Sequence, residues 1–363
     1  MYTKFVIWRA QSMSKIFKQQ TARNTIGIHS ANAPATIVHH SQKQSTFEVD
    51  GKNYNASCAG CLNPVCMRFS PNELLLPGNL LSEFPADVDD SVCPTNAIVW
   101  ERGHDTPTII SDLCINCGIC ARRCPFGAIY SDGYTGIIHI NEEDVLFVVV
   151  NSENARNHEN QVRDFKNAKH TGQYLLPHAD FIENIYAKLH SLQTGAQFPN
   201  LAVRNLLLTL GNKCIIRRRG DVYFRIDAAV INGNLIGIAE IEFKKDSLES
   251  PRAILDDIAV LSSRYGVDKD KIKPLIISLE FPNTRTEYWR VIKDIKDVLG
   301  IEIQSISFGA ICLLAWSFRC VSIDEFNFYA DIDSPSIKNG IEQLCAFDVI
   351  QIPKNRAILE QTK

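Results

Sequence analysis

The stretch that decides the fold of this chain is CINCGICARRCPFGAI, residues Cys114–Ile129. Its cysteines follow one another at intervals of three, three and four residues: Cys114, Cys117, Cys120 and Cys124. Three thiolates in such a tight loop can hold three corners of one inorganic group, while Gly118 lets the backbone approach that group closely. The fourth ligand must then come from elsewhere in the chain. The spacing therefore predicts a loop that binds a metal centre through cysteine.

A second cysteine run lies upstream and ends in a related way. CAGCLNPVC, residues Cys58–Cys66, supplies three cysteines, and CPTNAI, residues Cys93–Ile98, repeats the Cys-Pro-x-x-Ala-Ile tail of the later run. Two features distinguish this run from the later one. One interval is longer, and an insertion of 26 residues, 67–92, precedes Cys93.

The two runs together resemble a bacterial two-cluster ferredoxin, in which the fourth cysteine of each run serves the other cluster. Carried over by position, the resemblance implies two [4Fe–4S] clusters. The first would be bound by Cys58, Cys61, Cys66 and Cys124. The second would be bound by Cys114, Cys117, Cys120 and Cys93. Because of the longer interval and the insertion, a [3Fe–4S] or labile cluster is the alternative for the first set. Zinc is the alternative for both, although pairs of C-x2-C need no Cys-Pro tails.

The composition is that of a soluble globular protein in a reducing compartment. The chain is 45% hydrophobic and 22% charged, and no apolar stretch approaches the roughly 20 residues that span a bilayer. Four of the twelve cysteines lie outside the runs, scattered in apolar contexts as core thiols are: Cys214, Cys312, Cys320 and Cys345. Clustered thiolates without a secretory segment indicate the cytoplasm.

With 363 residues, the chain has room for two or three domains. We expect a basic N-terminal arm (1–45), a ferredoxin-type domain (46–145), a linker (146–174), an α/β domain (175–320) and a C-terminal extension (321–363). The first 47 residues hold six basic and no acidic side chains. A flexible arm, an arm that contacts an anionic partner and an organelle transit segment all fit this composition. The remainder has a net charge of -9, which excludes a general polyanion binder.

The second half predicts alternating helices and strands. Helices are expected near 178–192, 200–211, 250–265 and 286–299, with Gly211, Gly266 and Gly300 as stops. Strands are expected at 214–218, 222–231, 235–243 and 274–281, with one or two more within 301–316. The sequence Asn232-Gly233-Asn234 predicts a hairpin between the second and third strands.

Acidic residues gather on the two strands of this hairpin. Strand alternation places Glu240, Glu242 and Lys244 on one face. A turn over Gly233-Asn234 would set Asp227 opposite Glu240, and a turn over Asn232-Gly233 would shift the pairing by two residues. Either turn keeps these groups on one face. A solvated charged face of an antiparallel sheet is the alternative.

The pattern Asp227…Glu242-x-Lys244 and the order of elements resemble the common core of the PD-(D/E)XK nuclease superfamily. The resemblance implies an α+β or α/β fold with a mixed sheet flanked by helices. It implies Mg²⁺ or Mn²⁺ held by Asp227 and Glu242, with Glu240 as the competing ligand and Lys244 as the catalytic lysine. A helical Glu that such enzymes often add would be Glu183. Phosphate contacts are expected from Arg217, Arg218, Arg219 and Lys245.

The sequence thus predicts an iron–sulfur-cluster-containing DNA endonuclease of restriction, phage defence or repair. The alternative is an electron-transfer or redox-sensing ferredoxin protein, whose C-terminal domain binds a partner protein or nucleic acid and cleaves nothing.

Overall fold

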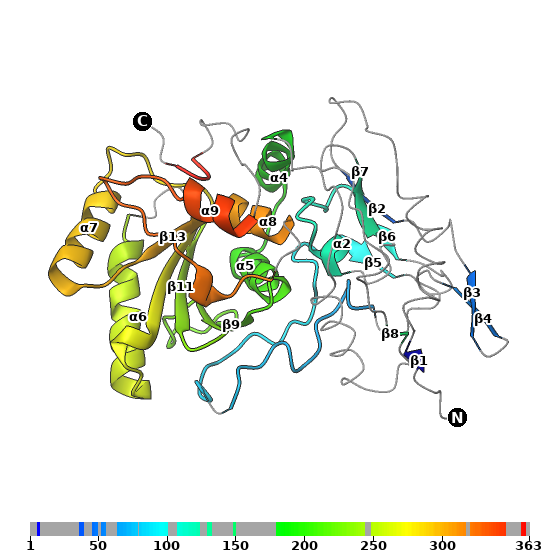
Figure 1. Cartoon of the computed structure of the whole chain (residues 1–363), viewed down its shortest axis with the longest axis horizontal. Coiled ribbons are helices and arrows are strands. Elements are labelled where there is room, and N and C mark those ends of the chain that lie inside the picture. Colours follow the sequence, from blue (N-terminus) through cyan, green and yellow to red (C-terminus); the bar gives the residue numbers. More distant parts are fainter. Residues whose placement is uncertain are drawn as a thin grey trace. The chain divides into compact units, whose positions relative to one another are not determined.

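A computed structural model describes residues 64–78, 80–100, 107–123, 179–243, 248–316, 320–345 and 357–360. It also gives the backbone of short strands at 6–7, 36–39, 46–49, 52–55, 129–132 and 148–149. Five of the candidate site residues lie outside these ranges: Cys58, Cys61, Cys124, Lys244 and Lys245. The chain forms two compact units (Figure 1), one from Met1–Asn72 and Asp90–Thr194, the other from Glu73–Asp89 and Gly195–Lys363.

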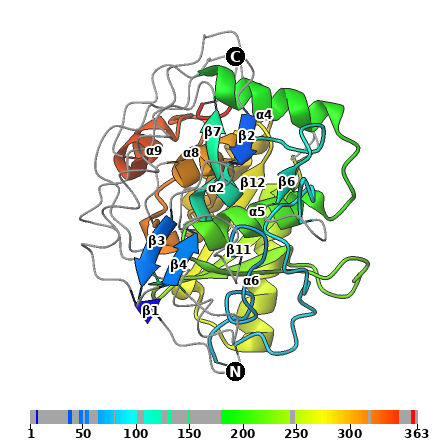
Figure 2. The same cartoon turned by 90° about the vertical axis from the view of Figure 1, so that its right-hand side faces the viewer.

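In the part of the first unit that the structure describes, short antiparallel strand pairs accompany helices α2 (Ile119–Arg123) and α4 (Ala179–Ser191) (Figure 2). The pairs are β1 (Val6–Ile7) with β8 (Val148–Val149), β2 (Thr36–His39) with β7 (Ile129–Asp132), β3 (Thr46–Val49) with β4 (Lys52–Asn55), and β5 (Ile98–Val99) with β6 (Thr108–Ile109). Within this unit, Val65, Phe69, Val92, Ile115 and Ile119 are almost fully buried.

A five-stranded sheet forms the centre of the second unit. Its strands are β9 (Lys213–Ile216), β10 (Ala228–Ile231), β11 (Ile236–Glu242), β12 (Ile272–Ser278) and β13 (Gln304–Ser307), and their order is β13-β12-β11-β10-β9. The first three strands form an antiparallel meander, whereas β12 pairs parallel to β11 and β13 pairs parallel to β12. This confirms the expected mixed sheet.

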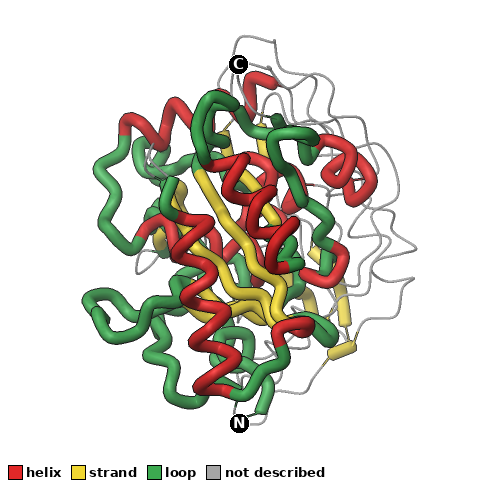
Figure 3. Tube along the Cα trace, turned by 90° about the vertical axis from the view of Figure 1, so that its left-hand side faces the viewer, coloured by secondary structure: helices red, strands yellow, loops and turns green. Residues whose placement is uncertain are grey.

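Helices cover both faces of this sheet, as expected. They are α5 (Phe198–Thr209), α6 (Ser250–Tyr265), α7 (Tyr288–Leu299) and α8 (Phe308–Trp316). α6 and α7 lie across one face, seen from that side in Figure 3, and α5 packs on the other. α9 (Lys338–Cys345) and the short turns η2 (Lys269–Lys271) and η3 (Ile323–Glu325) complete the unit. Among the described helices, none combines the length and the apolar character needed to cross a bilayer.

Local sequence signals explain where the helices begin and end. Pro251 stands in the first turn of α6, where its missing N–H costs nothing. Gly266 and Gly300 end α6 and α7 in the left-handed conformation, with φ of 64° and 68°, which glycine adopts without strain. All three positions were readable from the sequence.

Two parts of the second unit need comment. β13 confirms the strand expected within 301–316, and residues 308–316 after it form helix α8; the strand expected from residue 222 begins only at Ala228. Residues 308–315 of α8 are all buried, so this segment is apolar on every side and shows no periodicity by which helix and strand could be told apart. Residues 222–226 form a loop, and Val222 and Tyr223 are 78% and 90% exposed.

The insertion after Cys66 divides between the two units. In the first unit, an antiparallel bridge between Arg68 and Ser91 closes the base of the insertion, flanked by a hydrogen bond from Phe69 N to Asp90 O of 2.8 Å. The residues between these ends, Glu73–Asp89, belong to the second unit. We call this segment the strap.

Candidate functional site

In the first unit, four cysteines line one small cavity: Cys93, Cys114, Cys117 and Cys120. They are the four that the sequence assigned to the second cluster. The remaining walls are mostly apolar, from residues such as Ile98, Ile109 and Ile119. Apolar walls limit the access of water to a bound group, and this is one of the means by which a protein sets a redox potential.

Backbone geometry shapes this cavity. Gly118 and Asn116 have positive φ, 78° and 58°, so the loop between Cys114 and α2 turns tightly, as the spacing predicted. The Ala97 amide donates to Cys93 Sγ over 3.1 Å. Such an N–H···S bond orients the thiolate and stabilises its negative charge.

The arrangement of these thiols fits an iron–sulfur cluster better than a zinc ion. A cubane binds one thiolate at each of four irons, so its ligands surround a volume, whereas a zinc ion requires four ligands at about 2.0–2.3 Å from a single point. In the described ranges, no three side chains of His, Cys, Asp or Glu are placed so that they could hold one metal ion. Four thiols around a common apolar cavity match the first requirement.

Cys66 is the described member of the other predicted ligand set, and it is buried. Arg123, which is 2% exposed, donates from Nε to Val65 O over 2.6 Å, and its guanidinium lies 4.3 Å above the centre of the Phe69 ring. The chain beside Cys66 is therefore tied to the residue that precedes Cys124.

In the second unit, the hairpin register brings acidic side chains together. Ala228 pairs with Ala239 and Ile231 with Ile236, so Asp227 stands opposite Glu240. This is the register of the Gly233-Asn234 turn, one of the two alternatives. Gly233 has a φ of 93°, which the turn requires. On the neighbouring parallel strand, Ser278 pairs with Glu242. These pairings place the acidic residues at one end of the sheet.

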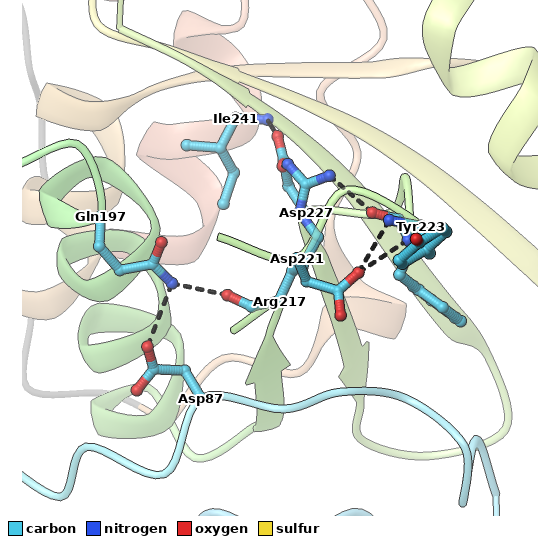
Figure 4. Close-up of polar contacts among 8 residues, drawn as sticks. Asp87, Gln197, Arg217, Asp221, Tyr223, Asp227 and Ile241 are labelled. Atoms are coloured by element: carbon cyan, nitrogen blue, oxygen red, sulfur yellow. Dashed lines mark hydrogen bonds and ion pairs between the residues drawn. The ribbon is translucent and has the colours of Figure 1, made fainter. Parts of the chain in front are cut away.

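Arg217 and the Ile241 amide both donate to the Asp227 carboxylate (Figure 4), and the Asn200 side chain bonds it as well. Its Oδ1 accepts a hydrogen bond of 2.8 Å from Arg217 Nη2, and its Oδ2 accepts one of 3.1 Å from the Ile241 amide. Arg217 also donates from Nη1 to Phe224 O over 2.6 Å. Arg217, predicted to contact phosphate, therefore faces Asp227, whereas Arg218 and Arg219 are exposed on the adjoining loop.

Burial, with neighbouring negative charge, raises the pKa of three carboxyl groups at this site. Burial raises the pKa of Glu240 to about 8, and the neighbouring charges of Asp227, Asp257 and Glu242 add to the effect. Burial, followed by the charge of Asp227, likewise raises the pKa of Asp257 to about 7. The pKa of Asp227 is also raised, chiefly by burial, although the Ile241 amide and Arg217 oppose the shift. We call Asp227, Glu240, Glu242 and Asp257 the carboxylate cluster.

Residues 107–130 match the family model of 4Fe-4S binding domains. The match covers the second cysteine run and the strands around it. It supports an iron–sulfur protein with a 4Fe-4S cluster in the first unit. No curated protein matches the chain.

Sequence reasoning missed Asp257, which lies on α6. It is 2% exposed, and among the described residues its Oδ2 has no hydrogen-bond partner; Ser278 Oγ on β12 is likewise buried with none in those ranges. A signal for Asp257 was present, because it stands at the helical spacing of the buried residues Ile254, Ile258 and Leu261. An acidic residue inside an apolar stripe marks a buried polar site.

Glu183, the upstream candidate, lies on α4 in the first unit. The helix that directly precedes the sheet is α5, and it contains no acidic residue. The acidic groups of the cluster therefore come from the residue before β10, from β11 and from α6.

Proposed function

We propose that this iron–sulfur protein is a Mg²⁺-dependent DNA endonuclease of the PD-(D/E)XK type. The observation that carries the proposal is the order α5–β9–β10–β11–α6–β12, with Asp227 opposite Glu240 and next to Glu242 at one end of the sheet. This order resembles that of the superfamily core, and Asp227 and Glu242 would take the acidic positions of its signature. The fold alone does not imply the activity, so the argument rests on the acidic residues.

The carboxylate cluster has the chemistry of a divalent cation site. Mg²⁺ keeps several of its waters and is usually held by only one or two carboxylates, so a pair suffices although no three such side chains of the described ranges are placed to hold one ion. After burial, the charges of Asp227, Asp257 and Glu242 contribute to the raised pKa of Glu240, and a cation would offset that contribution. Asp227 and Glu242 would bind the ion, with Glu240 as the competing ligand. Because Arg217 holds Asp227 Oδ1 at 2.8 Å, that oxygen would have to leave Arg217 to ligate.

A bound Mg²⁺ would activate water and neutralise charge on the scissile phosphate. The other steps belong to side chains of the protein. Glu240 and Asp257, whose pKa values lie at about 8 and about 7, can exchange a proton near neutral pH. Lys244 would orient the attacking water or stabilise the phosphorane, and Arg218, Arg219 and Lys245 would contact the DNA backbone.

The test is cleavage by anaerobically purified protein with Mg²⁺ or Mn²⁺ on duplex, single-stranded, modified and supercoiled DNA. We expect Asp227→Asn and Lys244→Ala each to lower the rate by about 100-fold or more, with the cluster content unchanged. Asp256→Asn is the matched control, since Asp256 adjoins Asp257 on α6 but pairs with Arg225 at the surface, 59% exposed. Cleavage that survives in both site variants, or its absence on every substrate, would contradict the proposal.

Electron transfer is the second candidate function, and the 4Fe-4S match with the cysteine cavity favours it. Anaerobic redox titration separates the two functions in part. A reversible couple at low potential would favour electron transfer, whereas a redox-silent cluster would favour a structural role beside a catalytic second unit.

A further inference from the structure

The strap begins and ends close to two predicted cluster ligands. Cys66 directly precedes the insertion, residues 67–92, and Cys93 directly follows it. In the first unit the two arms are joined by the Arg68–Ser91 bridge and by hydrogen bonds from Phe69 N to Asp90 O and from Val92 N to Met67 O, of 2.8 and 2.9 Å. Ligation of the two cysteines therefore fixes both ends of the strap.

Within the second unit, the strap pairs with the edge of the sheet. Ala86 forms an antiparallel bridge with Arg217, the Asp87 amide donates to Ile216 O over 2.8 Å, and the Arg218 amide donates to Pro85 O over 2.7 Å. Phe84 packs edge-on against Phe224, with ring centres 4.6 Å apart. The strap thus adds a short strand beside β9, which is otherwise the last strand of the sheet.

Two polar side chains of α5 secure this pairing. Arg204 is fully buried, and its guanidinium donates to Asp87 O and Asp89 O over 3.4 and 2.6 Å. Gln197 Nε2 donates both to Asp87 Oδ2 and to Arg217 O, over 3.3 and 2.6 Å (Figure 4). A buried cation that loses hydrogen-bond partners is strongly unfavourable, so the docked strap is the stable arrangement.

Arg217 links the strap to Asp227. The strap bonds the backbone on either side of Arg217, at Ile216 O and the Arg218 amide. Arg217 itself bonds Asp227, through its amide to Asp227 O over 2.9 Å and through its side chain to Oδ1. A shift of the strap would therefore move the Arg217 side chain relative to Asp227, whose carboxylate it orients.

We propose that the strap positions Arg217, and through it Asp227, so that the shape of the carboxylate cluster depends on iron–sulfur ligation at Cys66 and Cys93. Arg217 and the strap are positioning elements in this scheme. The proposal goes beyond the proposed nuclease function and holds for a binding site as well, because it concerns the arrangement of the side chains and not their reaction.

Amide hydrogen exchange, measured on the full chain by mass spectrometry, tests this coupling. The cluster-loaded protein is compared with protein made cluster-free by anaerobic chelation. We expect the Asp87, Arg217 and Arg218 amides to exchange about tenfold faster in the cluster-free form. The Asp87 and Arg218 amides bond the strap to the sheet edge, and the Arg217 amide donates to Asp227 O, so the three report undocking of the strap and loosening at Asp227. The β12 amides, Ile272–Ser278, should keep their protection.

A spacer variant separates coupling from general loosening. Six-residue Gly-Ser spacers are inserted between Asn72 and Glu73 and between Asp89 and Asp90, and iron content and visible absorbance verify the clusters. We expect loaded and cluster-free forms of this variant to exchange alike at the three amides. The same spacer after Asp268, in the exposed turn between α6 and β12, should leave the coupling intact.

Three results would overturn the proposal. One is equal exchange of the three amides in loaded and cluster-free protein. Another is a matching loss of protection in β12, which would show that the whole unit loosens. The third is a difference that persists in the strap-spacer variant. Each result is independent of cleavage, so failure of the coupling and failure of the nuclease proposal remain distinguishable.

Discussion

The cysteine cavity and the carboxylate cluster are built on opposite principles. Three of the four cysteines in the cavity fall within Cys114–Cys120, so one loop supplies most of the site, and its walls are apolar. The carboxylate cluster draws on the residue before β10, on β11 and on α6, and burial with neighbouring negative charge raises the pKa of Glu240 and Asp257. The cysteines of the cavity are ligands, and their arrangement is stabilised when an inorganic group binds them. The carboxylate cluster is a concentration of like charge, which protons or a cation should stabilise.

The largest difference should follow from removing one cysteine of the cavity. We expect Cys117→Ser to lose the second cluster, seen as a loss of iron and visible absorbance, because serine is a poor substitute for a soft thiolate ligand. Cys320→Ser is the control, since Cys320 lies exposed in the second unit and should leave the iron content unchanged. Equal iron in both variants would contradict the assignment of Cys117.

Mg²⁺ should bind the carboxylate cluster and stabilise the second unit. At pH 8 we expect Mg²⁺ to stabilise the second unit, by about 2.7 kcal/mol when its concentration is 100 times the dissociation constant. Asp257→Asn should weaken this effect and Asp256→Asn should not. Calorimetry of the cluster-loaded protein, with Ca²⁺ and Na⁺ in parallel, measures it. An unchanged unfolding temperature would show that the carboxylates do not bind the ion.

Protonation of the carboxylate cluster should stabilise the second unit in the absence of a cation. Because the pKa values of Glu240 and Asp257 are raised to about 8 and about 7, the folded unit binds more protons than the unfolded chain between pH 5 and pH 8. Its stability should therefore fall as pH rises through this range, on the order of 2 kcal/mol. Glu240→Gln should flatten the profile. A stability that rises with pH in the wild type would refute the assignment.

The smallest effect concerns the exposed arginines beside the cluster. We expect Arg218→Ala and Arg219→Ala each to weaken DNA binding modestly and to reduce the slope of log K against log salt by about 1. Fluorescence anisotropy over a salt series measures the slope. Arg264→Ala, at the far end of α6, serves as a control. An unchanged slope in both variants would place the DNA elsewhere.

Much of the fold could be predicted because its signals are local. The Asn232-Gly233-Asn234 hairpin and the stops at Gly266 and Gly300 follow from backbone sterics at single residues. The α8 segment could not be assigned, because it is buried on all sides and shows no alternation.

In the cysteine cavity and the carboxylate cluster, too, only the local signals could be predicted from the sequence. The cavity cysteines were assigned by spacing alone, and the Asp227–Glu240 pairing was one of two registers that the turn allowed. Asp257 meets the other acids only when α6 packs on the sheet. The docking of the strap uses mainly backbone groups, which leave no signature in the sequence, so neither its place nor the role of Arg204 could be foreseen.

The strap has a consequence for how the chain can be divided. A cut between the cysteine region and α5 would produce a C-terminal fragment that lacks Glu73–Asp89, so Arg204 would lose the carbonyls of Asp87 and Asp89 and the edge of β9 would be bare. Neither half of the chain can therefore be replaced without affecting the other. Recombination that exchanged one of them alone would disrupt the other, and a lineage that keeps the strap must inherit both halves together.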